Sequence, residues 1–342
     1  MVNMKEIHKI LRCVAPYYVQ FEVTSRCNNR CFFCYNNIGD VGRDELSSIE
    51  IKRIISEMAD VGVFKINFNG GEPLIRKDFF EFATYAAEKN FQLHMNTNAT
   101  PMTPETARKI AELMPSVCVS LLSPIPDEHD KMSGRNGAFY EVLRGMDYLA
   151  EAGVNMEVNV CTTKHNFEKL EQIAQVAAMH GCNTICSTRY ILSDIAQKDL
   201  LLDSQDTVRL IHILLKIKDN VKGIQQVVLP GPVPFCEIPD SEKENLKLLN
   251  IPCQFGYGLC RISPTGKVTP CPISDDVLAD LRQVSFQEAW ESRNWEKYET
   301  LCHIPLNCRK CEDFAECKCG CIVYDQCLLN SGITPATRKW GK

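Results

Sequence analysis

From residue 18 to about residue 220, stretches typical of strands alternate with amphipathic stretches typical of helices. Six strands are predicted at residues 18–24, 63–69, 91–97, 117–122, 155–161 and 183–190, and six helices at residues 48–60, 78–89, 104–114, 138–152, 167–180 and 204–218. Strands separated by helices in this rhythm indicate parallel βαβ units in one sheet. Because six units are fewer than the eight of a closed barrel, we expect an α/β fold with an open, TIM-like partial (β/α)6 barrel.

The pattern changes at residues 229–234, where three prolines interrupt regular structure. Beyond them, short turns and cysteines replace the long helices and strands. We therefore expect an N-terminal extension at residues 1–17, the barrel at residues 18–229 and a cysteine-rich domain at residues 230–342.

Composition excludes several classes of protein. The 342 residues are 45% hydrophobic and 24% charged, as in ordinary globular proteins. A formal net charge of -5 argues against nucleic acid as a partner. The sequence has neither a membrane-span-length apolar stretch nor the apolar run of a signal peptide, so we expect no membrane partner and a cytoplasmic location. Thiols stay reduced there, so 19 cysteines indicate metal binding more than disulfides.

Three cysteines, Cys27, Cys31 and Cys34, share one short loop directly after the first predicted strand. Three thiolates can bind three corners of a 4Fe-4S cubane and leave one iron open for a ligand that is not protein. The loop lies where barrels build their active sites. The alternative is a zinc site, which would need a nearby fourth ligand, and no Cys or His follows Cys34 until His94.

A second motif, Gly70-Gly71-Glu72-Pro73, follows the second predicted strand. Together the two motifs resemble the radical S-adenosylmethionine (SAM) superfamily, in which the GGEP motif contacts the amino group of the methionine moiety of SAM. Arg135 is displaced from the position at which relatives often place an arginine. The resemblance implies that SAM is bound by Phe33, Gly70, Gly71, Glu72, Pro73, Asn96, Asn98, Ser120 and Asn159.

The resemblance also implies the chemistry. A reduced cluster passes one electron to the sulfonium of SAM, and the resulting 5′-deoxyadenosyl radical takes hydrogen from the substrate. The protein supplies ligation, orientation and a dry pocket. An external electron donor, such as a flavodoxin or a ferredoxin, is expected to reduce the cluster.

The C-terminal third contains a second cysteine pattern. Residues 260–271 predict a hairpin with a Thr-Gly turn and a cysteine at each end. The cysteine spacing resembles the SPASM domain, which implies two auxiliary 4Fe-4S clusters and hence three clusters in all; a pair of zinc ribbons is the alternative. The resemblance assigns Cys253, Cys260, Cys271 and Cys321 to auxiliary cluster I, and Cys308, Cys311, Cys317 and Cys327 to auxiliary cluster II.

The remaining cysteines have no assigned ligand role. Cys319 lies between two expected ligands and could displace either, and Cys236 and Cys302 are treated as spare. Small buried hydrophobic residues are the interpretation for Cys13, Cys118, Cys161, Cys182 and Cys186.

The leading functional hypothesis is oxidative modification of a peptide or protein side chain by a maturase of ribosomal peptides, with electrons leaving through auxiliary cluster I. Pro272 stands where the sulfatase-maturating branch has an aspartate, which weakens that assignment. The alternatives are oxidation of a small molecule, such as a tetrapyrrole side chain or an aminocyclitol, and a non-enzymatic iron-sulfur electron carrier. No catalytic acid or base is identified; His129, Asp130, Arg189 and Tyr190 lie near predicted strand ends and could face substrate.

Overall fold

The computed structural model describes residues 13–36, 42–190, 199–231, 233–251, 253–254, 256–299, 304, 308, 310–317 and 320–321. Six strands of its sheet pair in parallel and in chain order, which confirms the predicted partial barrel. They are β1 (Tyr18–Thr24), β2 (Lys65–Gly70), β3 (Gln92–Thr97), β4 (Ser116–Ser120), β5 (Asn155–Thr162) and β6 (Thr184–Arg189).

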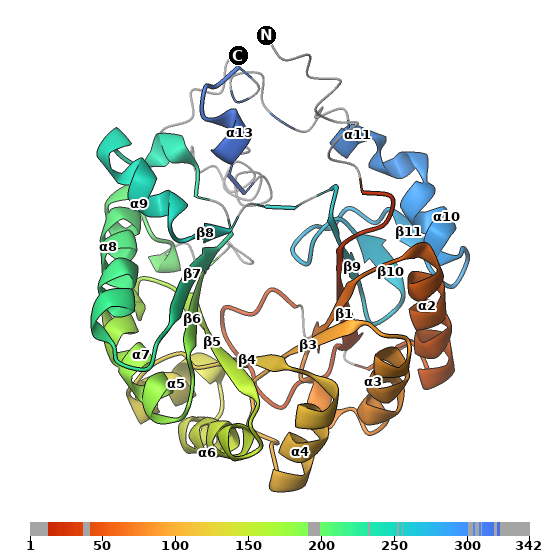
Figure 1. The fold of residues 1–342 in the computed structure, drawn as a ribbon, viewed down its shortest axis with the longest axis horizontal. Coiled ribbons are helices and arrows are strands. Elements are labelled where there is room, and N and C mark those ends of the chain that lie inside the picture. Colours follow the sequence, from red (N-terminus) through yellow and green to blue (C-terminus); the bar gives the residue numbers. More distant parts are fainter. Residues whose placement is uncertain are drawn as a thin grey trace.

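Helices cover the outer face of this curved sheet (Figure 1). They are α2 (Ser48–Val61), α3 (Phe79–Glu88), α4 (Pro104–Leu113), α5 (Pro126–Ser133), α6 (Ala138–Glu151), α7 (Leu170–Met179) and α8 (Ser204–Asn220). All were predicted except α5, whose sequence is almost entirely polar and lacks an apolar period. Local signals set the ends of α2, because Ser47 and Glu50 form a capping box and Gly62 ends the helix with φ 92°.

The sheet does not stop at β6. β7 (Gln226–Pro230) pairs in parallel with β6, and β8 (Asn250–Ile251) pairs with β7. The expected boundary between residues 229 and 230 therefore falls at the end of β7. The sequence pattern missed this strand because it is short and ends in proline.

The C-terminal part also extends the other edge of the sheet. β9 (Leu259–Ile262) pairs in parallel with β1, and its antiparallel partner β10 (Lys267–Thr269) forms the predicted hairpin with Gly266 in the turn. β11 (Ala279–Asp280) completes that edge. The remaining elements are short: η2 (Pro73–Ile75), η3 (Phe167–Lys169), η5 (Phe235–Glu237), η6 (Asp240–Glu242), α9 (Lys243–Lys247), α10 (Phe286–Glu291), η7 (Arg293–Trp295), α11 (Glu296–Glu299) and α13 (Phe314–Cys317).

Side chains alternate between the two faces of each barrel strand. On β1, Val19, Phe21 and Val23 belong to the fully buried core between sheet and helices. Tyr18 and Gln20, at the alternate positions of the strand, line the interior of the barrel. Polar residues therefore lie on the inner wall while the apolar core lies outside it, and the barrel interior is a site rather than a packed core. Among the described residues, no helix is both long and apolar enough to cross a bilayer.

Candidate active site

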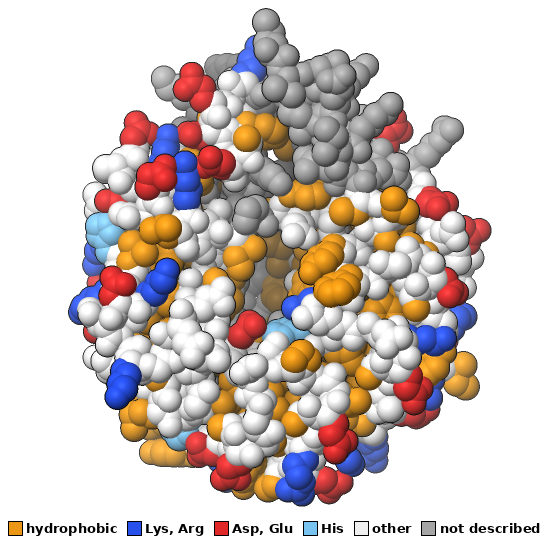
Figure 2. Space-filling model, in the orientation of Figure 1, with side chains coloured by type: hydrophobic (Ala, Val, Ile, Leu, Met, Phe, Trp, Pro, Cys, Tyr) orange, Lys and Arg blue, Asp and Glu red, His pale blue; other side chains and the backbone are white. Residues whose placement is uncertain are grey.

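A cavity of about 1070 Å³ occupies the barrel. Cys27 and Cys34 line it near the carboxyl ends of the strands, and Lys65, His94 and Glu157 line it near their amino ends. The space-filling view shows this hollow at the centre of the face drawn in Figure 2, with charged side chains at its mouth. The cavity is larger than many small-molecule pockets.

The cysteine loop and the GGEP turn are joined through their backbones. The Gly71 amide donates to the Thr24 carbonyl at 2.7 Å, and the Glu72 amide donates to the Arg26 carbonyl at 2.8 Å. A Cβ atom on Gly71 would lie 1.9 Å from the Arg26 carbonyl oxygen, so only glycine allows this approach. The two motifs thus form one unit.

Glu72 lies behind the cavity wall and is fully buried. Its Oε1 accepts hydrogen bonds from Thr97 Oγ1 at 2.8 Å and from the Leu74 amide at 3.1 Å, and its Oε2 accepts from the Asn98 amide at 2.7 Å. Burial raises the pKa of Glu72 to about 7, although these hydrogen bonds oppose the shift. Glu72 therefore holds the end of β3 to the GGEP turn, and its contact with SAM stays a prediction.

The structure brings most of the expected SAM contacts to the lining of one cavity. Asn98 Nδ2 donates to Asn28 Oδ1 at 2.8 Å and approaches Cys27 Sγ at 3.8 Å, so it also positions the cysteine loop. Pro73, like Glu72, lies outside the lining. The expected residues that line the cavity are Phe33, Gly70, Gly71, Asn96, Asn98, Ser120 and Asn159.

The three thiols of the loop lie close together and are largely buried. Burial raises the pKa of Cys27, Cys31 and Cys34, and the other two thiols raise that of Cys31 further, to about 12. In the described part of the chain, no three Cys, His, Asp or Glu side chains converge on a single metal ion. A cubane spreads its ligands over several irons, so three thiols that do not meet at one point are compatible with a cluster.

Two polar groups in the cavity lining have no hydrogen-bond partner. The Oδ1 atoms of Asn67 and Asn69 are buried without a hydrogen bond, in residues that are 2% and 4% exposed. Both residues line the cavity. Their Nδ2 atoms donate to Asn96 and Gln20, each at 3.3 Å. Unsatisfied buried acceptors are costly, so a bound ligand with donor groups would stabilise this wall.

Residues 21–179 match the family model of the Radical SAM superfamily. The chain is also 30% identical over 314 residues to mycofactocin maturase MftC of Mycobacterium tuberculosis, an alignment covering 90% of this chain and 78% of that protein. The chain belongs to the radical SAM superfamily. The predicted resemblance to its SPASM branch is confirmed with it. Membership implies a 4Fe-4S cluster and SAM, which together supply reductive cleavage of SAM when bound.

Two further relatives broaden the comparison. The AdoMet-dependent heme synthase of Methanosarcina barkeri is 27% identical over 290 residues, covering 81% of this chain and 83% of that protein. SuiB of Streptococcus suis, solved with bound S-adenosylmethionine, superposes with a TM-score of 0.76 at 16% identity over 96% of this chain and 78% of SuiB. SuiB bound to its precursor peptide SuiA gives a TM-score of 0.74, at 16% identity over 96% of this chain and 76% of SuiB. The SuiB structures confirm the fold of this radical SAM enzyme.

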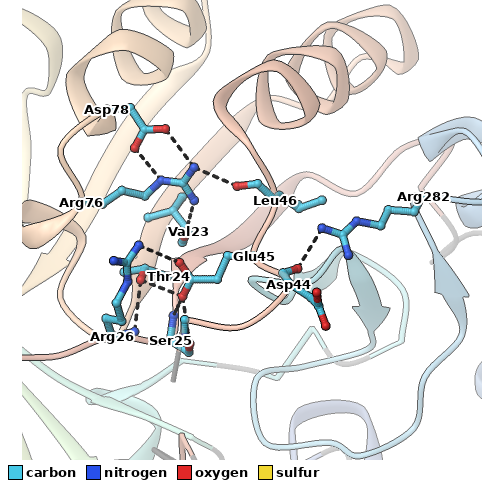
Figure 3. Close-up of polar contacts among 11 residues, drawn as sticks. Val23, Thr24, Ser25, Arg26, Asp44, Glu45, Leu46, Arg76, Asp78 and Arg282 are labelled. Atoms are coloured by element: carbon cyan, nitrogen blue, oxygen red, sulfur yellow. Dashed lines mark hydrogen bonds and ion pairs between the residues drawn. The ribbon is translucent and has the colours of Figure 1, made fainter. Parts of the chain in front are cut away.

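Two charged residues that the sequence analysis missed hold the cysteine loop of the radical SAM enzyme (Figure 3). Glu45 Oε1 accepts from the Ser25 amide at 2.7 Å and from the hydroxyls of Ser25 and Thr24 at 2.8 and 2.9 Å. Burial alone would raise the pKa of Glu45, but these hydrogen bonds outweigh it and lower the pKa. Arg76, three residues beyond the GGEP motif, donates to the Val23 carbonyl at 2.6 Å.

The same network reaches the C-terminal hairpin. Arg76 also donates to the Leu46 carbonyl at 2.8 Å, and the Leu46 amide donates to the Pro264 carbonyl at 2.7 Å. Arg282 donates to the Asp44 carbonyl at 2.8 Å (Figure 3). Residues 44–46 therefore connect the cysteine loop to the hairpin. No motif in the sequence marks these contacts, because each joins residues distant along the chain.

Cys253, Cys271 and Cys321 line the same cavity as the cysteine loop. Burial raises the pKa of the Cys271 thiol, and the neighbouring Cys321 and Cys253 raise it further. Cys260, also expected in this set, is fully buried in the outer core, opposite Val19 in the β1–β9 register. The structure therefore does not bring Cys260 to the other three thiols.

The second set of C-terminal cysteines is separate. Cys308, Cys311 and Cys317 line a second, small hollow, and Cys236 lines it with them. The expected fourth member, Cys327, lies outside the described residues, as do Cys302 and Cys319. Of the cysteines interpreted as small buried hydrophobic residues, Cys118 and Cys182 are buried, and Cys161 and Cys186 are only partly buried. The interpretation is wrong for Cys13, which is exposed. Cys118, Cys161 and Cys186 line the cavity.

The candidate substrate-facing residues divide into two groups. Arg189, Tyr190 and His129 line the cavity. Asp130 instead supports the start of α6, where its carboxylate accepts from the amides of Gly137 at 2.5 Å and Phe139 at 2.9 Å. His129 is 1% exposed, and its Nδ1 accepts from the Leu122 amide at 3.2 Å.

His129 gives a testable pH dependence. Burial lowers its pKa from 6.5 to about 4, so the folded state binds fewer protons than the unfolded state between these values. Its contribution to stability is complete above pH 6.5 and is lost as pH falls towards 4. The free energy of unfolding of the wild type should fall between pH 7 and pH 4.5. We expect this fall to be about 1 to 3 kcal/mol smaller in His129→Gln, measured by urea unfolding at both pH values. The matched control is His212→Gln, at an exposed histidine; an equal change in both variants would contradict this assignment.

Proposed function

We propose that this radical SAM enzyme oxidatively modifies a side chain of a peptide or protein. The observation that supports the proposal is the shared cavity, which is lined both by Cys27, Cys31 and Cys34 and by Cys253, Cys271 and Cys321. A substrate in this space would contact both cysteine sets at once.

Asn67 and Asn69 support a peptide as the substrate. They are two residues apart on β2, both residues line the cavity, and their buried Oδ1 atoms have no hydrogen-bond partner. Residues two apart on a strand are separated by about 6.6 Å, which is also the spacing of alternate N–H groups in an extended chain. A peptide lying along β2 would present N–H groups at the spacing of these two side chains and would satisfy both acceptors once the two amides turn towards it. MftC, a maturase, and SuiB, solved with a precursor peptide, support the same substrate class.

The residues have distinct proposed roles. The thiols of Cys27, Cys31 and Cys34 would hold the SAM-binding cluster, and Gly70 and Gly71 would admit SAM close to the backbone. Asn96, Asn98, Ser120, Asn159 and the backbone of Phe33 complete the proposed SAM pocket. A substrate that fills the cavity beside Asn67 and Asn69 would displace water, which limits side reactions of a radical.

Two auxiliary 4Fe-4S clusters belong to the proposal. Cys253, Cys271 and Cys321 would ligate auxiliary cluster I together with Cys260, if β9 shifts, or with a thiol outside the described residues. Bound there, the cluster would supply a one-electron acceptor close to the substrate. A flavodoxin or ferredoxin of the cytoplasm would supply the electron that starts the reaction.

A second candidate is the oxidation of a tetrapyrrole side chain. The 27% identity to an AdoMet-dependent heme synthase and the size of the cavity favour it. The other alternative from the sequence, an electron carrier without turnover, is set aside because the family and its maturase members are enzymes.

Anaerobic mass spectrometry tests the two candidates. Reduced holoenzyme is incubated with SAM and either peptides encoded near its gene or a tetrapyrrole with propionate side chains. We expect a peptide to lose two hydrogens in step with the formation of 5′-deoxyadenosine. Modification of the tetrapyrrole alone would favour the second candidate, and 5′-deoxyadenosine without any change in either substrate would contradict both.

A further inference from the structure

Cys236 lies beside the second set of C-terminal cysteines. It belongs to η5, just after β7 leaves the barrel, and lines one hollow with Cys308, Cys311 and Cys317. The other lining residues are apolar: Pro234, Phe235 and Phe314. Four thiols around an apolar hollow match the ligand number of a closed 4Fe-4S cluster.

Several contacts fix this arrangement. The Phe235 amide donates to Cys317 Sγ at 3.4 Å, a contact of the kind that stabilises ligating sulfur. Lys243 Nζ lies 2.7 Å from Asp313 Oδ2, and Lys247 Nζ lies 2.8 Å from Glu316 Oε2. The segment from η5 to α9 is therefore bound to the segment that ends in α13. Cys236 is held near the other thiols by its own neighbours.

We infer that Cys236 is the fourth ligand of auxiliary cluster II, with Cys308, Cys311 and Cys317. This inference rests on the proposed second auxiliary cluster and replaces Cys327 in its expected ligand set. The cluster would then attach the end of β7 to the C-terminal segment. Metal binding would contribute directly to the stability of this junction.

Iron analysis of the anaerobically reconstituted full-length enzyme tests the inference. We expect Cys236→Ala to lose about four irons per chain, the content of one cubane, and Cys327→Ala to lose none. Cys311→Ala is the positive control, and it should lose the same amount as Cys236→Ala. Cys236→Ser adds a spectroscopic readout, because an oxygen ligand in place of sulfur shifts the electron paramagnetic resonance signal and the reduction potential of this cluster.

The results distinguish the inference, that Cys236 is a ligand, from its premise, that auxiliary cluster II exists. If Cys311→Ala loses iron and Cys236→Ala does not, the inference is wrong and the cluster stands. If neither variant loses iron, the proposed cluster and the inference both fail. Loss from Cys327→Ala alone also overturns the inference. If Cys236→Ala and Cys327→Ala both lose iron, an unchanged spectrum in Cys236→Ser overturns the inference and a shifted spectrum supports it.

Discussion

Replacing Cys31 with alanine is expected to abolish the cleavage of SAM. Cys31 is the central thiol of the cysteine loop, and its neighbours Cys27 and Cys34 lie close enough to raise its pKa. Two thiols cannot hold a cubane that already lacks a fourth protein ligand. We expect less than about 1% of the wild-type rate of 5′-deoxyadenosine formation and a loss of about four irons per chain, the content of one cubane.

The matched control is Cys182→Ala. Cys182 is buried just before β6, and its thiol donates to the carbonyls of Met156 and Thr184 at 3.3 and 3.1 Å. This variant loses a packed thiol but no proposed ligand, so we expect full iron content and a small loss of stability, on the order of 1 kcal/mol. Unchanged iron in Cys31→Ala, or equal iron losses in both variants, would show that the loop does not hold the cluster.

Much of the barrel could be predicted because its signals are local. Each of the six predicted strands and each of the six predicted helices carries its own apolar period. Helix α2 also carries its capping box. The strands that were missed carry little local information: β7 has five residues and β8 has two. Their place in the sheet depends on pairing with distant strands, as does the pairing of β9 with β1.

The candidate site shows the same contrast between features marked by local sequence and features that depend on distant contacts. The cysteine loop and the GGEP turn each follow a strand directly, so parallel pairing of β1 and β2 brings them together. Glu45, Arg76 and Cys236 act across long sequence separations, and no spacing rule marks them. Cys260 shows the opposite case, since its spacing suits a ligand while the register of β9 turns it into the outer core.

Gly71→Ala is expected to reduce SAM cleavage by at least about 100-fold, because Gly71 lies at the junction between the GGEP motif and the cysteine loop. The new Cβ would lie 1.9 Å from the Arg26 carbonyl oxygen and 3.0 Å from the Cys27 nitrogen. Both neighbours are backbone atoms, so the loop itself must move. Displacing it breaks the bond from the Glu72 amide to Arg26 and moves the first thiol away from the other two.

Gly258→Ala is the control for this substitution. A Cβ there would meet the end of the flexible Gln254 side chain at 3.0 Å, which can move aside at little cost. We expect this variant to keep its iron and its rate of 5′-deoxyadenosine formation, measured side by side with Gly71→Ala. If Gly71→Ala matched this control in both measurements, the close approach of the GGEP turn to the cysteine loop would not be needed for the reaction. A full complement of iron combined with a slow rate would instead locate the damage in SAM binding, since Gly71 also lines the proposed SAM pocket.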